Sequence, residues 1–270
     1  MSGLEDGFGH ALAALGELIG LGARVLWLHA VVLLRAGPVM TLFPGFGDQG
    51  GVPMRVRLVL ALMLSAVTAS ADPPGLAQLA ADPPPLAWLL VSETAVGLLL
   101  GIGLRLLLVG LQTAGAMAAQ AMSLSQIAGS AGSEPMPAIE RLLVVGGLAL
   151  AMTLGLHVRL AEMLILSYGP LPAGRLPEAA ALAEWGVSRV AWAFGFAFSL
   201  AAPFVLVSLL YNLALGVINR AMPQLMMVFV GAPVISGAGL VLLLLLAPAM
   251  LGRWLEAVAA FVADPLAGAG

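Results

Sequence analysis

Three carboxylates lie within long apolar stretches of the sequence, where ionisable side chains are rare. They are Glu17, Glu93 and Glu162. Such groups can relay protons, but pairing with a basic group is the more common role, and we expect it for each. The three histidines show no metal-ligand spacing, and a chain without cysteine offers no thiolate nucleophile. The sequence therefore predicts no catalytic, cofactor-binding or metal-binding residues and no enzyme.

Four residues of the third apolar stretch repeat at intervals of four, which predicts one shared helix face. They are Glu93, Gly97, Gly101 and Arg105. The two glycines form a small-xxx-small step, which lets a second helix backbone approach closely. Glu93 and Arg105 lie about 18 Å apart on a straight helix, so each needs another partner or water. We interpret this face as a helix-packing face, and the lining of a central path is the alternative.

Gln112 and Gln120 lie further along the same stretch, with Ala116 between them. Intervals of four residues again predict one helix face, here with amides beside a small residue. Buried amides need hydrogen-bond partners, so we expect both to contact protein or a wet cavity rather than lipid. Packing between helices and a pathway role remain equally open.

The stretch 123–137 is small, polar and rich in glycine within a very apolar sequence. A flexible surface loop is the default interpretation of this composition. The alternative is a gate folded into a pore, because non-helical backbone at membrane depth is tolerated where it lines a cavity.

The elements that carry these residues are predicted to be membrane helices. Hydrophobic residues make up 61% of the 270-residue chain and charged residues only 9%, whereas a soluble domain has about 25% charged residues. A spanning helix needs about 20 apolar residues, and the chain has six candidate segments. They cover 9–34, 54–71, 86–122, 139–167, 187–218 and 224–262. We predict an all-α integral membrane protein of about six long hydrophobic helices arranged as hairpins.

Turn-forming residues separate these segments. The Arg35-Ala-Gly-Pro38 stretch ends the first segment, so we place Arg35 in a cytoplasmic loop that also holds Arg55 and Arg57. Prolines at 203 and 248 are expected to kink the last two segments. The net charge of -3 gives no electrostatic footprint for nucleic acid.

The very short connection near residue 220 is predicted to be the tip of a tight helical hairpin, and its residues resemble a known family. Asn219-Arg-Ala-Met-Pro-Gln224 and Phe229-Val-Gly-Ala-Pro233 are similar to the hallmark stretch of the FliR family, whose injectisome relatives are called SctT. The motif residues are Asn219, Arg220, Pro223, Gln224, Phe229, Gly231 and Pro233. Stretches at 53–57, 93–115 and 155–172 also resemble the family, in the correct order.

The resemblance implies a subunit of the flagellar type III export gate, at the flagellar basal body in the bacterial inner membrane. Family members assemble with FliP-like and FliQ-like subunits, and an FlhB-like subunit associates with them. Membrane lipid and unfolded flagellar export substrates are the other implied partners, and no cofactor is implied. The fold would have a FliP-like part at 1–168, a linker at 169–186 and a FliQ-like hairpin at 187–270.

The family's loop between its third and fourth segments helps to plug the closed pore, which favours the gate interpretation of 123–137. We expect four residues of this stretch to belong to the gate. They are Gly129, Gly132, Met136 and Pro137.

The leading hypothesis is a channel subunit that shapes and closes a pore for unfolded flagellar proteins and makes no bonds itself. A virulence injectisome subunit of the same family is the first alternative. A stand-alone secondary transporter for a small solute is less favoured, because it would need a midplane site and usually internal repeats, which the sequence does not show.

Overall fold

The computed structural model describes residues 22, 24–43, 52–76, 79, 84–123, 138–221 and 227–267. Within these ranges every regular element is an α-helix and none is a strand. The described helices include four that are long and apolar enough to cross a membrane, or five when one bent pair counts as a single span. The predicted all-α integral membrane fold is confirmed.

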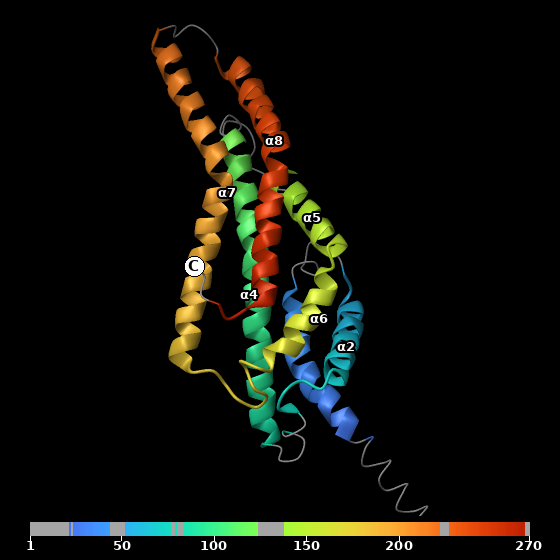
Figure 1. Cartoon of the computed structure of the whole chain (residues 1–270). Helices are drawn as coiled ribbons and strands as arrows, with labels where there is room; N and C mark the ends of the chain where they lie inside the picture. The colour runs from blue at the N-terminus through green and yellow to red at the C-terminus, as the bar shows by residue number, and fades with distance from the viewer. Residues whose placement is uncertain are drawn as a thin grey trace, which may run out of the picture. The chain divides into compact units, whose positions relative to one another are not determined.

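Figure 1 shows the described helices in chain order. The first described helix, Arg24–Leu42, has no label in Figure 1 and is called the N-terminal helix below. The others are α2 (Met54–Ser70), α4 (Leu86–Ser123), α5 (Ala138–Thr153), α6 (Leu156–Ser167), α7 (Ala179–Ala221) and α8 (Met227–Ala263).

The N-terminal helix runs through the predicted break and ends at Leu42. Arg35 is therefore helical and fully buried, and the prediction that it lies in a cytoplasmic loop is wrong. The physical reason is tertiary packing: Val39 and Met40, just beyond Pro38, are buried as well. Their burial outweighs the local preference of Gly37-Pro38 for a turn.

The predicted fourth segment is two helices rather than one. α5 and α6 are bent by 72° relative to each other at the break that follows Thr153. Gly155 has a φ of +83° in this break, a conformation that glycine adopts without a steric penalty. By contrast, α7 and α8 stay helical through Pro203 and Pro248, so neither proline ends its helix.

Three of the helices are longer than a bilayer requires. α4 has 38 residues, α7 has 43 and α8 has 37. At 1.5 Å per residue these lengths are about 57, 64 and 55 Å, against a hydrocarbon core of about 30 Å. Part of each helix must therefore lie outside the hydrocarbon layer or in contact with protein.

The chain forms two compact units. The first unit comprises Met1–Ile102 and Val158–Glu178, so it contains the N-terminal helix, α2, the beginning of α4 and most of α6. Its core is a cluster of buried apolar residues from these helices and the loops between them. The members are Val31, Val32, Leu76, Leu89 and Tyr168.

The second unit comprises Gly103–His157 and Ala179–Gly270. Within it α5 and α7 both contact α8, and α7 and α8 run as an antiparallel hairpin (Figure 1). The buried indole of Trp254 on α8 donates a hydrogen bond of 2.9 Å to the carbonyl of Leu107 on α4. These units follow spatial contacts, and the FliP-like and FliQ-like division predicted by resemblance stays a prediction.

Candidate functional site

A fully buried ion pair joins two helices of the first unit. Arg35 lies on the N-terminal helix and Glu93 on α4, and neither side chain has any exposed surface. Arg35 Nε donates to Glu93 Oε2 at 2.8 Å, and Arg35 Nη2 donates to Glu93 Oε1 at 3.3 Å. The two bonds make the planar, two-pronged geometry in which a guanidinium binds a carboxylate most strongly. Arg35 is thus the partner that Glu93 was expected to need.

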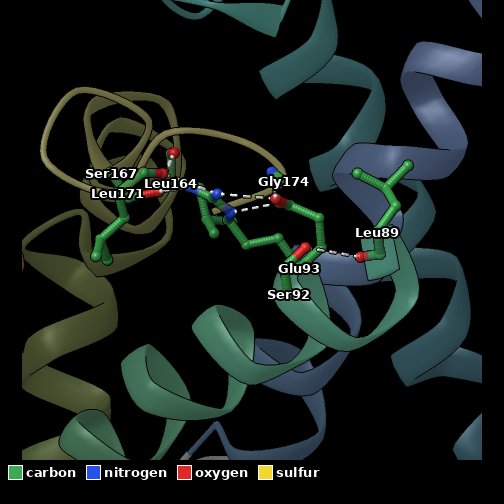
Figure 2. Close-up of polar contacts among 8 residues, drawn as sticks. Leu89, Ser92, Glu93, Leu164, Ser167, Leu171 and Gly174 are labelled. Carbon is green, nitrogen blue, oxygen red and sulfur yellow. Dashed lines mark hydrogen bonds and ion pairs between the residues drawn. The ribbon is translucent and has the colours of Figure 1, made fainter. Parts of the chain in front are cut away.

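The same two side chains also hold the end of α6 and the loop that follows it (Figure 2). Arg35 Nη1 donates to Ser167 Oγ at 3.0 Å, and Nη2 donates to the carbonyl of Leu171 at 2.9 Å. The backbone N–H of Gly174 donates to Glu93 Oε1 at 2.9 Å. We call these five residues the Arg35–Glu93 network. It ties the N-terminal helix, α4 and residues 167–174 into one cluster.

The loop end of the network depends on a glycine and two aromatic rings. Gly174 has a φ of +72°, which favours glycine, and its carbonyl accepts a 2.8 Å hydrogen bond from Trp88 Nε1. The ring of Tyr168 lies 3.6 Å from the central guanidinium carbon of Arg35, a cation–π contact. The buried Tyr168 hydroxyl has no hydrogen-bond partner among the described residues.

This arrangement supports structure rather than acid–base chemistry. A guanidinium does not deprotonate in proteins, and both oxygens of Glu93 already accept hydrogen bonds. Within the described part of the chain, no group of three or more His, Asp or Glu side chains could hold a metal ion.

Gly97 and Gly101 lie where α4 packs directly against the N-terminal helix. A Cβ on Gly97 would collide with the backbone carbonyl of Arg35. A Cβ on Gly101 would lie 3.1 Å from the carbonyl oxygen of Pro38 and 3.0 Å from a methyl of Leu42. Both glycines therefore pack against a helix of this same chain.

Arg105 does not share that buried face, although it continues the four-residue spacing. An α-helix turns by about 100° per residue, so each step of four advances the side chain by about 40° and three steps by about 120°. Arg105 is half-buried, as is Gln112, whereas Gln120 is exposed. Among the described residues none of these three side chains has a hydrogen-bond or ion-pair partner.

Further close contacts in the second unit were not singled out from the sequence. A Cβ on Gly115 would lie 2.5 Å from Cα of Glu140, so α4 and α5 pack directly against each other at this glycine. A Cβ on Gly147 would lie 3.0 Å from Leu111 and 3.2 Å from the ring of Trp254. A glycine inside an apolar helix is the available signal, but spacing alone does not say which glycines meet a backbone.

Known proteins resemble this chain in sequence over most of its length. The sequence profile of a family described as bacterial export proteins, family 1, matches residues 26–261. A protein of Caulobacter vibrioides named flagellar biosynthetic protein FliR is 33% identical over 225 residues, which cover 82% of this chain and 88% of that protein. The chain belongs to the FliR family of bacterial export proteins.

Two further relatives carry the same name. The FliR protein of Escherichia coli is 29% identical over 82% of each chain. That of Pectobacterium carotovorum is 27% identical over 86% of this chain and 87% of its own length. The resemblance to the FliR family inferred from the sequence is therefore confirmed.

The stretches that carried this resemblance lie in different parts of the FliR-family fold. Asn219 and Arg220 are exposed in the last turn of α7. Pro223 and Gln224 lie outside the described residues, and positions 229–233 lie in the first turns of α8. The predicted gate stretch, 123–137, lies outside the described residues apart from the helical backbone of Ser123, so all four predicted gate residues do too.

Proposed function

We propose that the chain is a channel subunit of the flagellar type III export gate in the bacterial inner membrane, where it shapes and closes the pore for unfolded flagellar proteins. The proposal is carried by the sequence identity of 27–33% between this chain and three proteins named flagellar biosynthetic protein FliR, over at least four-fifths of each chain. Because all three relatives are flagellar by name, the flagellar system is favoured over a virulence injectisome.

The exposed apolar surface supports a role inside a larger assembly. α7 is about 64 Å long and exposes large apolar side chains along most of its length, from Val187 to Ile218. A hydrocarbon layer of about 30 Å cannot cover that length. Partner helices would cover the remainder, and we propose FliP-like and FliQ-like subunits for this role, with an FlhB-like subunit beside them.

The division of labour along the chain is also part of the proposal. Residues 1–168 would act as a FliP-like part, 169–186 as a linker and 187–270 as a FliQ-like hairpin. The 123–137 stretch would plug the closed pore. The Arg35–Glu93 network would hold in place the N-terminal helix and α4, the helix that leads into this stretch. No step of this function requires the chain to make or break a covalent bond.

Composition of the purified complex tests the assignment. The chain would be co-expressed with the neighbouring genes of its own organism, purified through a tag on this chain, and analysed by native mass spectrometry. We expect one copy of this chain with several copies of a FliP-like protein, about five per chain. Recovery of the chain alone, with solute uptake when it is reconstituted in vesicles, would instead support a stand-alone transporter.

A further inference from the structure

The second half of α4 carries a line of polar side chains on a face that is half-buried or exposed in the described part of the chain. Its inward face from residue 104 to 122 is apolar and buried. The opposite positions are half-buried or exposed, and they include Arg105, Gln112 and Gln120. At about 100° per residue, Gln112 lies about 20° to one side of Arg105 around the helix and Gln120 about 60° to the other, so the three side chains form a stripe about 80° wide.

The centre of this stripe is a charge in the middle of an apolar helix. α4 has 38 residues, and Arg105 is about 28 Å from its start and 27 Å from its end at 1.5 Å per residue. A hydrocarbon layer of about 30 Å placed anywhere along a helix of about 57 Å includes this position. Arginine keeps its charge there, so it needs an acceptor of opposite charge.

Two other arginines within long helices show how this chain satisfies a buried guanidinium. Arg35 binds Glu93, and Arg189 donates to the backbone carbonyls of Pro265 and Ala267, in the segment that follows the end of α8. Arg105 has no such acceptor in the part of the chain that the structure describes. The difference points to an acceptor supplied by another polypeptide.

We propose that the stripe of Arg105, Gln112 and Gln120 docks a helix of another subunit that places a carboxylate, from Asp or Glu, against Arg105. Amide or hydroxyl groups of the same partner helix would bind the two glutamines. Gln112 lies about two turns along α4 from Arg105, and Gln120 lies about two turns further. The half-buried apolar positions between them, such as Val109, provide the packing surface on either side of the polar contacts. The proposal rests on the proposed function in one respect, namely that the chain works within a multi-subunit complex.

Substitution of Arg105 tests the ion pair. Arg105→Leu and Arg105→Glu should each reduce recovery of partner subunits with the tagged chain by at least about tenfold, because the partner carboxylate stays buried without its counter-ion. Arg105→Lys keeps the charge and should retain part of the recovery. Arg141→Leu is the matched control, because Arg141 lies exposed in the first turn of α5. In an Arg105→Glu strain, motility revertants should carry Asp or Glu changed to a neutral or basic residue in a partner.

Cysteine labelling distinguishes a docked helix from a water-lined path. The chain has no cysteine, so an introduced thiol is its only one. Ala116→Cys on the stripe should resist a charged, water-soluble thiol reagent in the assembled complex and react after the subunits are separated. Ala118→Cys on the buried face is the control and should react only on unfolding.

Three results would overturn the inference. The first is rapid labelling of Ala116→Cys in the assembled complex, which would show a water-lined path. The second is full partner recovery with Arg105→Leu. The third is a revertant that maps to an acidic residue of this chain. Failure of the unsubstituted chain to recover any partner would instead contradict the proposed function, so the two failures are distinguishable.

Discussion

Arg35 and Glu93 are separated by 58 positions in the sequence, yet they bind each other and together bind Ser167, Leu171 and Gly174. A buried ion pair is weak evidence for net stability, because desolvation of both charges offsets much of their attraction. Its effect appears when one partner is removed, because the other charge is then left in an apolar core. At the scale of single residues, we therefore expect the network to disfavour any packing of these helices that separates the two charges.

Removal of one charge should cost more than removal of both. We expect Glu93→Leu and Arg35→Met each to lower the unfolding free energy by about 3–5 kcal/mol, and the double variant to recover much of that loss. Detergent-solubilised protein, titrated to its unfolding midpoint, provides the measurement. Additive losses in the double variant would show that the two side chains do not act as a pair.

Tyr168 should contribute through its ring and not through its hydroxyl. Tyr168→Phe keeps the ring 3.6 Å from the guanidinium carbon of Arg35 and removes a buried hydroxyl that has no partner among the described residues. Its stability should be unchanged or higher by about 1 kcal/mol. Tyr168→Leu should lose about 2 kcal/mol through the lost cation–π contact and poorer packing. A thermal scan of both variants compares them, and equal melting temperatures would contradict this assignment.

At the scale of helices, glycines decide how closely two backbones approach. α4 meets the N-terminal helix at Gly97 and Gly101, and it meets α5 at Gly115. At Gly97 and Gly115 the neighbouring atoms are largely backbone, which cannot rotate away as the end of a flexible side chain can, whereas at Gly101 they are the side chain of Leu42 and the carbonyl of Pro38. The lipid around a membrane helix is as apolar as the helix surface, so the hydrophobic effect does little to drive helices together. Close packing therefore supplies much of the stability of a helix pair.

Gly97→Ala and Gly110→Ala should therefore have opposite effects. A Cβ at Gly97 collides with the carbonyl of Arg35, so we expect a loss of about 1–3 kcal/mol. A Cβ at Gly110 lies 3.4 Å from the nearest atom, an ordinary contact, so the better helix propensity of alanine should leave stability unchanged or higher. Unfolding midpoints of the two variants in one detergent make the comparison. The larger Gly97→Leu and Gly101→Leu should also block co-purification with partner subunits.

At the scale of the whole molecule, the described helices leave many large apolar side chains exposed. Large side chains are exposed on α2, on α7 and on α8. In a protein whose helices exceed the thickness of the hydrocarbon layer, lipid covers only part of that surface. The remainder is expected to lie in contact with other subunits of the export apparatus.

Deletion of residues 127–136 tests the proposed gate. The resting complex should then leak ions, because the segment that closes the pore is missing, while co-purification with partner subunits stays intact. Single-channel recording in planar bilayers, with the undeleted complex as the control, measures the leak. An intact complex with unchanged conductance would show that this segment does not close the pore.

The sequence by itself determined the class of protein. An apolar composition with few charges and long segments between turn residues leaves only a helical membrane fold, since every backbone group must be hydrogen-bonded within its own helix. Short motifs along the chain were also enough to indicate the FliR family. Both conclusions depend on local information, namely composition and residues close together in the sequence.

The tertiary structure decided which side chains meet. Glu93 was expected to need a partner, but spacing could not identify Arg35, which the Gly37-Pro38 turn signal had placed in a loop. Arg105 has the same four-residue spacing as Glu93, yet the accumulated rotation of the helix puts it on another face. Pairing over long distances depends on how helices pack, and packing energy outweighs local turn preference where a charge or a backbone is buried.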